Sequence, residues 1–384
     1  MKKGELKIMA IDRKAIMQKT LEAIRAKMPN ETIGKYSEYG GSADVKTITT
    51  GSLAADAVMG GGFAEGRLAC IVGHTSAGKT TLALTACAEL QKRNPDANIL
   101  YIDSECSIDP KYAKSLGVNM DDVILMQPDN GEDGYTAAEM FINSGVGDLV
   151  VIDSLAAMIP KAMFDVELGD QAQIGMGARL DSQGIARIFA SAHKNKTTVI
   201  LINQWKKAVK VNAFDRTDGI SGNYYMPGGE TFKFYLSQLI EVQRVSKIYE
   251  RDENGIEQLT SNQTRIRVLK NKIAPPGRES DFFITFGEGV DKAQEAIELG
   301  IQSGDVVRSG QMYYLAEDVD ENGRIKEGKQ SFRGRAKFVS YLRENPDIVE
   351  DLRAKISEKF LKNCNDDITL AEGTETKEVK APID

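Results

Sequence analysis

Short apolar segments rich in β-branched residues recur through the middle of the chain and alternate with amphipathic stretches. The apolar segments predict buried strands at 67–72, 98–103, 148–153 and 197–203. The stretches around them predict helices at 79–93, 110–116, 134–144 and 173–195. Uninterrupted apolar strands that alternate with helices indicate an α/β fold with a mostly parallel central sheet covered on both faces. Three later segments alternate in polarity and are candidates for antiparallel strands: 238–245, 264–270 and 281–286.

The segments outside this pattern define the expected domains. Residues 11–28 predict a short amphipathic helix, and the polar, Gly-rich stretch after it separates an N-terminal arm (1–38) from the core (39–289). A small C-terminal α/β domain is expected at 290–361, followed by a disordered acidic tail at 362–384. Within the core, residues 205–229 show no sustained period, and a loop of that length in a compact domain is usually functional or disordered.

Composition narrows the class of protein. The 384 residues are 41% hydrophobic and 27% charged, and no apolar run approaches the roughly 20 residues of a membrane span. Four cysteines without CxxC spacing and two histidines argue against a zinc site or a disulfide framework and favour the cytoplasm. The 49 basic and 56 acidic residues give a net charge of −7, so nucleic acid can be bound only through local basic patches.

A phosphate-binding motif stands between the first predicted strand and the first predicted core helix. The residues that fit GxxxxGK[ST] are Gly73, His74, Thr75, Ser76, Ala77, Gly78, Lys79 and Thr80. In such a P-loop, backbone N–H groups and the N-terminus of the following helix hold the phosphates of a nucleotide. Lys79 is expected to reach the β- and γ-phosphates of ATP, and the Thr80 hydroxyl is expected to ligate Mg²⁺.

Polar residues at the ends of the other predicted strands complete a candidate hydrolytic site. Asp153 ends LVVID, the place of a carboxylate that holds Mg²⁺. Either Glu105 or Asp103 is expected to activate the attacking water; Glu105 is favoured for its reach beyond the sheet, and Asp103 stays as the alternative. Gln204 opens the long loop, where it could bond the γ-phosphate and make the order of the loop depend on the nucleotide.

These motifs together resemble the RecA family of bacterial and phage DNA recombinases. The resemblance runs from about Thr47 to Phe360 in blocks that include TITTGSLAADAVMGGGFAEGRL, YIDSECSIDPKYAKSLGV, QPDNGED, VVIDSLAAMIPKA, INQ, GGETFKFY and VLKNKIAPP. It implies a RecA-type P-loop core and a DNA-stimulated ATPase that uses ATP and Mg²⁺. It further implies helical filaments of this chain on single-stranded DNA, homologous pairing and strand exchange with double-stranded DNA, and no membrane partner.

The resemblance assigns roles at the nucleotide. Glu105 matches the hydrolytic glutamate of the family and Gln204 its ATP-sensing glutamine. Thr81 is assigned to nucleotide binding, and Asp109 and Tyr112 match the residues that bond and stack on adenine.

The resemblance also assigns residues to contacts between subunits. Lys270 and Lys272 match a lysine pair that reaches the ATP of the next subunit, which would couple hydrolysis to filament assembly. Lys233 and Phe234, in GGETFKFY, are assigned to the subunit interface.

The expected DNA contacts fall in two loops and on one helix. Loop one is expected at 167–175 and loop two at 205–229, and the residues that match family DNA contacts are Arg179, Ser182, Gly228 and Gly229. Loop two combines positive charge, on Lys206, Lys207 and Lys210, with flat side chains, on Trp205, Phe214, Tyr224 and Tyr225. Positive charge beside aromatic rings suits single-stranded nucleic acid, because stacking tolerates any base.

A second basic segment lies in the expected C-terminal domain. Residues 324–343 hold seven basic side chains and one acid, Glu327, and match the region that captures duplex DNA in the family. The tail from 365 to 384 holds six acids and two lysines and resembles the family's acidic tail.

The chain departs from the family pattern at several positions, and two other functions stay open. His74-Thr75 stand where Pro-Glu is usual, Cys106 stands for a histidine, and loop two is longer. A ring-forming helicase shares the core, but KNK in VLKNKIAPP argues against it. A non-catalytic scaffold is opposed by the intact set of Lys79, Glu105 and Asp153.

Overall fold

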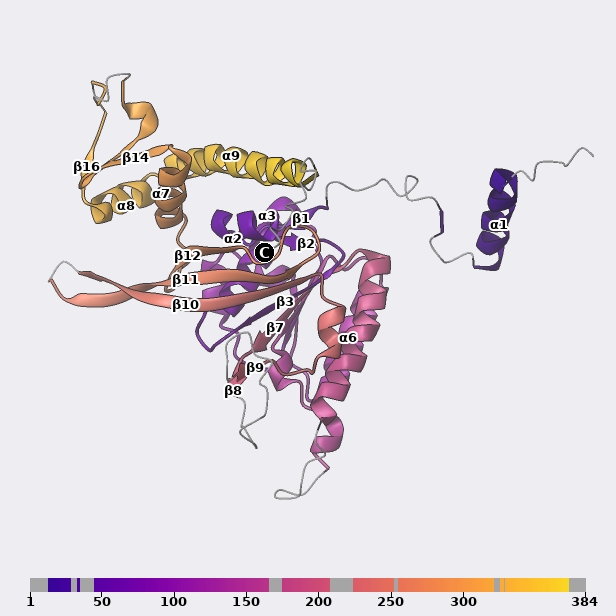
Figure 1. The fold of residues 1–384 in the computed structure, drawn as a ribbon. Helices are drawn as coiled ribbons and strands as arrows, with labels where there is room; N and C mark the ends of the chain where they lie inside the picture. Colours follow the sequence, from indigo (N-terminus) through magenta and orange to yellow (C-terminus); the bar gives the residue numbers. More distant parts are fainter. Residues whose placement is uncertain are drawn as a thin grey trace, which may run out of the picture. The chain divides into compact units, whose positions relative to one another are not determined.

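Nine strands within the described residues form one sheet, in the order β13-β12-β11-β10-β3-β7-β6-β4-β5 (Figure 1). The computed structural model describes residues 13–28, 33–34, 45–165, 175–207, 224–251, 255–320, 325–327 and 329–372. The parallel part of the sheet consists of six strands: β3 (Leu68–Gly73), β4 (Ile99–Asp103), β5 (Val123–Met126), β6 (Leu149–Asp153), β7 (Thr198–Gln204) and β10 (Gln238–Arg251). The antiparallel part adds β11 (Glu257–Asn271), β12 (Glu279–Thr285) and β13 (Gly289–Val290).

The predicted α/β class and all seven predicted strands are confirmed. β10 joins the two parts of the sheet, because it pairs parallel with β3 and antiparallel with β11. Two strands of the sheet were not predicted: β13, with two residues, and β5, whose four residues lie at the edge of the sheet with Ile124 and Leu125 exposed. The β10–β11 hairpin also extends past its prediction, to Arg251 and Glu257, where it continues beyond the rest of the sheet (Figure 1).

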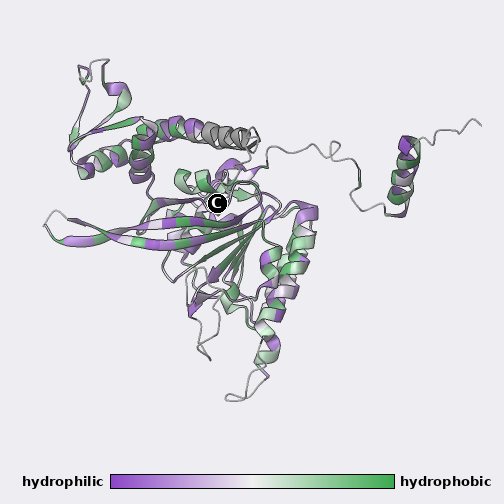
Figure 2. Ribbon diagram, in the orientation of Figure 1, coloured by the Kyte–Doolittle hydropathy of each residue, from purple (hydrophilic) through white to green (hydrophobic). Residues whose placement is uncertain are grey.

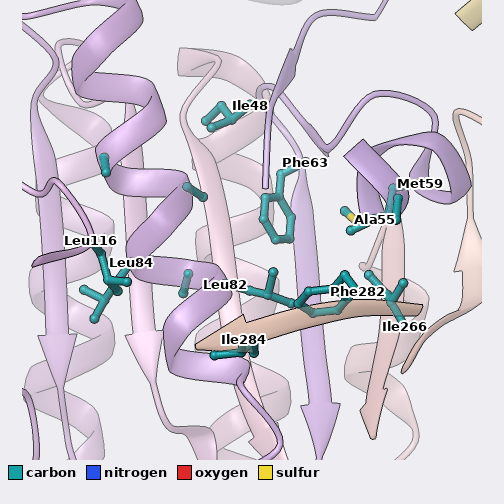
Figure 3. Close-up of a cluster of buried hydrophobic side chains, with 14 of the residues drawn as sticks. Ile48, Ala55, Met59, Phe63, Leu82, Leu84, Leu116, Ile266, Phe282 and Ile284 are labelled. Atoms are coloured by element: carbon teal, nitrogen blue, oxygen red, sulfur yellow. The ribbon is translucent and has the colours of Figure 1, made fainter. Parts of the chain in front are cut away.

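Apolar side chains alternate along the strands between two clusters, one on each face of the sheet. In β3, Ala69 and Ile71 belong to the first cluster, and Cys70 and Val72 belong to the second. Helices α2 (Leu53–Met59) and α3 (Lys79–Arg93) cover the first face, and α5 (Gly131–Asn143) and α6 (Met176–Asn195) cover the second. Figure 2 shows the middle strands in the green of hydrophobic residues, and Figure 3 shows Phe63, Leu82 and Phe282 packed together in the first cluster.

The remaining elements of the core are short and connect the layers. The pair β1 (Thr47–Ile48) and β2 (Phe63–Ala64) is antiparallel, as is the pair β8 (Lys206–Lys207) and β9 (Tyr224–Tyr225). A short helix, α4 (Pro110–Ser115), follows β4 as predicted. The 3-10 helices of the core are η2 (Met120–Asp122), η3 (Leu155–Ala157), η4 (Lys161–Met163) and η5 (Thr231–Phe234).

The C-terminal elements share a core with the first face of the sheet. They are α7 (Lys292–Ser303), β14 (Val306–Ser309), β15 (Met312–Leu315), η6 (Ala316–Asp318), β16 (Phe332–Arg333), α8 (Arg335–Glu344) and α9 (Pro346–Glu372). Phe338, Leu342 and Leu352 belong to the same apolar cluster as Phe63 and Leu82. Residues 46–384 accordingly form one compact unit, and the expected boundary near 290 stays a prediction.

A buried ion pair fastens α9 to the core. Arg353 donates to Glu295 Oε2 at 2.6 Å and to the carbonyl oxygen of Gly51 at 3.0 Å. The Glu295 carboxylate also accepts hydrogen bonds from Ser52 Oγ and from the N–H groups of Leu53 and Ala54, at the start of α2. Glu295 and Arg353 thus compensate each other's charge, and Glu295 also provides acceptors for the first N–H groups of α2.

The two ends of the chain were only partly predicted. Helix α1 (Arg13–Lys27), in a separate unit of residues 1–45, confirms the predicted N-terminal helix, and none of its residues is buried. Helix α9 extends to Glu372, beyond residue 361, where the C-terminal domain was expected to end and the tail to begin. Residues 373–384 of that tail lie outside the described residues. In the part of the chain that is described, no helix has the length and apolar character needed to cross a membrane.

Candidate nucleotide and DNA site

The P-loop follows β3 directly and leads into the first turn of α3. Gly73 ends β3 so close to β10 that a Cβ would lie 2.2 Å from the carbonyl oxygen of Val242. Gly78 is the N-cap of α3 with a φ of 95°, and a Cβ there would lie 2.3 Å from Ile284. Both glycines are therefore required by the backbone, and the N-terminus of α3 is capped by no side chain, as an anion-binding helix end requires.

The residues expected to hold Mg²⁺ lie together. Thr80 Oγ1 donates to Asp153 Oδ2 at 2.8 Å, and the buried Tyr101 hydroxyl donates to the same oxygen at 2.9 Å. Burial raises the pKa of Asp153, and the two hydrogen bonds oppose that shift. No cluster of three or more metal-binding side chains occurs in the described residues. A hydroxyl and one carboxylate fit Mg²⁺, which takes its other ligands from phosphates and water.

Lys79 is buried beside this pair. Its ammonium donates to the carbonyl oxygen of His74 at 2.8 Å. Burial lowers the pKa of Lys79, and the charges of Asp153 and Glu105 counteract the effect. A cation held in a partly desolvated site interacts strongly with an incoming phosphate.

Glu105 and Gln204 meet although they follow different strands. The Gln204 amide nitrogen donates to Glu105 Oε1 at 2.6 Å, and Ser154 Oγ donates to the same carboxylate. Asp103, the alternative, points elsewhere: its oxygens accept from the N–H groups of Ser107 and Ile108 and from Gln127. The structure thus brings Glu105 to Gln204, whereas Asp103 holds the turn after β4.

The expected adenine residues lie on α4. Asp109 is the N-cap of this helix and accepts from the N–H of Lys111. The Tyr112 hydroxyl lies 2.8 Å from Thr81 Oγ1, on the first turn of α3, and burial raises the pKa of Tyr112. Thr81 is therefore placed between the P-loop and the expected adenine residues.

One strand, β10, separates β11 and its Lys270 from β3, the strand that leads into the P-loop. Lys270, on β11, is opposite Leu239, which in turn is opposite Cys70 in β3. Lys272 lies farther along, toward the amino end of β3, whereas the P-loop begins at the carboxyl end. The Lys270 ammonium donates to the carbonyl oxygen of Lys233, so it contacts η5, on which the Phe234 side chain is 74% exposed.

Four of the expected DNA residues lie on or against the first half of α6: Arg179, Ser182, Gly228 and Gly229. Arg179 is exposed and Ser182 half-buried on this helix. A Cβ on Gly229 would contact Ala178, and one on Gly228 would lie 3.2 Å from an oxygen of Asp181. Lys206 and Lys207 form β8, while Lys210, Phe214 and residues 167–174 of loop one lie outside the described residues.

The ring of Trp205, which the sequence analysis counted among the flat side chains of loop two, is partly buried against the sheet. Its indole N–H donates to the buried Glu241 at 3.0 Å, and the ring packs against the second apolar cluster. Its backbone N–H donates to the carbonyl oxygen of Gly73, at 3.3 Å. Trp205 thus fixes the start of loop two against the P-loop and the sheet.

Comparisons with known proteins show which family this chain resembles. Residues 14–291 match the model of the RecA N-terminal domain. The protein named RecA from Psychrobacter arcticus is 37% identical over 363 residues, 94% of this chain and 96% of its own length. RecA from Bacillus pumilus is 36% identical over 375 residues (97% of each chain), and RecA from Levilactobacillus brevis is 37% identical over 91% of this chain and 85% of its own.

This chain belongs to the RecA family. It is accordingly a DNA-dependent ATPase and an ATP-dependent recombinase of DNA recombination and repair, which confirms the function implied by its motifs and sets aside the helicase and the scaffold.

Local sequence gave no signal for several residues around the site of this RecA-family protein. Tyr101 and Ser154 bond the carboxylates of Asp153 and Glu105, yet each reads as part of a strand or its end. Asp181 is buried on α6 and accepts from the Tyr135 hydroxyl at 2.8 Å. The burial of Asp181 could have been predicted from its place among the apolar positions of the helix predicted at 173–195.

Replacing Asp181 with Asn is expected to remove a pH-dependent contribution to the free energy of unfolding. Burial raises the pKa of Asp181 from 3.8 to about 7, although the Tyr135 hydrogen bond and the charge of Lys206 lower it. Because the folded state binds this proton more tightly than the unfolded state, the free energy of unfolding contributed by Asp181 falls as pH rises from about 4 to about 7. The loss amounts to a few kcal/mol, since a tenfold change in proton affinity is worth about 1.4 kcal/mol.

Denaturant unfolding at pH 4 to 8 checks this expectation, with the difference between wild type and Asp181→Asn as the measured quantity. Tyr135→Phe is the matched control, because it keeps the carboxyl but removes a hydrogen bond that favours the ionised form. The decline should then start at the same pH and continue to a higher pH than in wild type. Parallel profiles for wild type and Asp181→Asn would contradict the assignment.

The basic segment of the C-terminal region is less free than its sequence indicates. Acidic partners outside 324–343 pair with Lys329, Arg335 and Arg343, through Asp318, Glu298 and Asp291 respectively. Arg333 and Lys337 lie on β16 and α8, and Arg324 lies outside the described residues. The positive charge that residues 324–343 can offer to DNA is therefore smaller than the number of their basic side chains indicates.

Proposed function

We propose that this protein binds ATP with Mg²⁺ at the P-loop and uses Glu105 and Gln204 to connect hydrolysis to single-stranded DNA held by loop two. The observation that carries the proposal is the hydrogen bond of 2.6 Å between Gln204 and Glu105. Gln204 ends β7, and loop two starts at the next residue. A change at the Glu105 carboxylate therefore acts on Gln204, the last residue before loop two.

The side chains have separate tasks in this proposal. Glu105 orients and deprotonates the attacking water, and Lys79 with the N–H groups of the P-loop holds the phosphates. Thr80 and Asp153 would hold Mg²⁺, which neutralises charge on the phosphates when it is bound. Tyr101 fixes the Asp153 carboxylate, and Ser154 fixes that of Glu105. Thr81, Asp109 and Tyr112 are proposed to bind the nucleoside.

Lys270 and Lys272 are proposed to act on the ATP of a neighbouring subunit. Their position toward the amino end of β3 supports action in trans, because the P-loop of the same chain begins at the carboxyl end. The exposed Phe234 and the η5 lysine Lys233, which Lys270 contacts, are proposed to lie in the same interface. A head-to-tail contact of this kind builds a helical filament when it does not close.

The proposed DNA partners are single-stranded DNA at loop two and double-stranded DNA at the C-terminal region, in the cytoplasm. Arg179, Ser182, Lys206, Lys207, Lys210, Gly228 and Gly229 are the proposed contacts to the single strand. The exposed Arg179 and the lysines of β8 lie where phosphate contacts would add affinity without sequence preference.

Lys79→Ala is expected to abolish nucleotide-dependent binding of single-stranded DNA. Loss of a charge-assisted hydrogen bond to phosphate weakens ATP binding by about 10- to 100-fold. Titration of a labelled oligonucleotide, with and without a slowly hydrolysed ATP analogue, checks the result. Lys92→Ala is the control, because Lys92 lies at the other end of α3 in an exposed pair with Glu89. Unchanged nucleotide dependence in Lys79→Ala would refute the P-loop assignment.

A further inference from the structure

The stem of loop two turns one aromatic side chain toward the protein. In the β8–β9 pair, Lys207 lies opposite Tyr224 and Lys206 lies opposite Tyr225. Tyr224 is half-buried, whereas Tyr225 is 48% exposed. Successive side chains of a strand point to opposite faces, so one tyrosine contacts the molecule and the other faces away.

The ring that Tyr224 meets belongs to the P-loop. The ring centroids of His74 and Tyr224 are 4.7 Å apart, with 78° between the ring planes. This is an edge-to-face contact at a favourable separation. His74 follows Gly73 at the end of β3, so a residue of the nucleotide loop touches the stem of the DNA loop directly.

Nucleotide acts on the backbone of that same histidine. The Lys79 ammonium, the expected phosphate ligand, donates to the carbonyl oxygen of His74 at 2.8 Å. A phosphate competes for this ammonium, because a hydrogen bond to an anionic oxygen is stronger than one to a carbonyl. A change in the Lys79 bond therefore reaches the His74 peptide, whose ring lies against Tyr224.

We propose that the contact between His74 and Tyr224 couples the P-loop to loop two, in parallel with the contact between Gln204 and Glu105. Both rings are positioning residues: each acts through the stem and neither touches the reacting atoms. The proposal rests on the proposed function, in which ATP and single-stranded DNA bind these two loops. Coupling of two ligands is reciprocal, so DNA at loop two also changes the affinity of the P-loop for nucleotide.

The test measures the ratio of single-stranded DNA affinities with and without a slowly hydrolysed ATP analogue. His74→Ala and Tyr224→Ala are each expected to lower this ratio about three- to tenfold, the range of one edge-to-face pair. The double variant is expected to match the single variants, because the second change removes a contact that is already lost. Nucleotide affinity in the absence of DNA is measured for every variant, and the ratio is taken at a saturating concentration of the analogue, so that weaker nucleotide binding is not counted as lost coupling.

Two controls separate coupling from structure and from stacking on DNA. Tyr224→Phe keeps the ring and should keep the wild-type ratio. Tyr225→Ala removes the exposed ring next to it and should change both DNA affinities by the same factor, which leaves the ratio unchanged. If Tyr224→Ala does not fold, His74→Ala carries the test, since it alters an exposed side chain of a loop.

The outcomes distinguish this proposal from the one on which it rests. A wild-type ratio near one means that nucleotide does not control DNA binding, and the proposed function fails. A large wild-type ratio that survives both alanine variants overturns the His74–Tyr224 coupling alone. Losses that multiply in the double variant also overturn it, because they show two independent effects.

Discussion

Glu105→Gln is expected to lower DNA-stimulated ATP hydrolysis by about two to four orders of magnitude while single-stranded DNA stays bound. The amide cannot take a proton from water, and general-base catalysis contributes a factor of that size. It can still accept the hydrogen bonds from Ser154 and Gln204, so nucleotide and DNA binding should persist. Phosphate release and oligonucleotide dissociation, measured on the same sample, check both parts.

The alternative carboxylate provides the decisive comparison for Glu105. Asp103→Asn replaces one of the two oxygens that accept from the N–H groups of Ser107 and Ile108 with an NH2 donor. It is therefore expected to lower the melting temperature and to leave the intrinsic turnover close to that of wild type. Glu65→Gln, which alters an exposed ion pair with Arg93, is the matched control and should behave as wild type. Rapid turnover in Glu105→Gln would transfer the catalytic role to Asp103.

Lys272→Ala is expected to reduce the DNA-stimulated rate about a hundred- to a thousandfold, the usual cost of one lost charge-stabilising donor. The rate of wild type should rise cooperatively with protein concentration, and the variant should lose that rise. Lys272 is a cleaner target than Lys270, because Lys270 also bonds the carbonyl oxygen of Lys233 and its loss disturbs η5. Lys247→Ala, an exposed lysine on β10, is the control.

Mixing two inactive variants tests whether Lys272 acts in trans. A Glu105→Gln subunit can offer Lys272 to a Lys272→Ala neighbour, which still has its own Glu105. Mixed filaments should therefore recover part of the hydrolysis that each variant lacks. Absence of any recovery, in mixtures that do assemble on DNA, would place Lys272 in its own subunit's chemistry or outside the chemistry altogether.

Short-range patterns determined the phosphate site and most of the core. GHTSAGKT predicts its own loop because Gly78 needs a φ of 95°, which is a local requirement of the backbone, whereas the atoms that exclude a Cβ at Gly73 and Gly78 belong to the distant Val242 and Ile284. Runs such as LVVID predict buried parallel strands because both of their faces are covered. The edge strand β5 could not be predicted in this way. It has one neighbour and two exposed apolar residues, so its sequence does not show the pattern of a buried strand.

The order of the strands decided which polar residues meet, and no local pattern encodes that order. β6 lies between β4 and β7, yet the loops beyond these strands bring Glu105 to Gln204 and leave Asp103 to close a turn. Spacing along the chain favoured Glu105 but left Asp103 open, because the two acids stand two residues apart at the end of the same strand.

The tertiary structure also decided what charge and aromatic residues do. Trp205 reads as a stacking residue of loop two, but the long-range pairing of β3 and β10 places Glu241 within its reach. The acids that neutralise part of 324–343 are distant in sequence from Arg335 and Arg343. The sequence therefore determined the elements and the chemistry of the P-loop, since these depend on neighbouring residues. The partners of each side chain depend on long-range burial, and only the folded chain sets them.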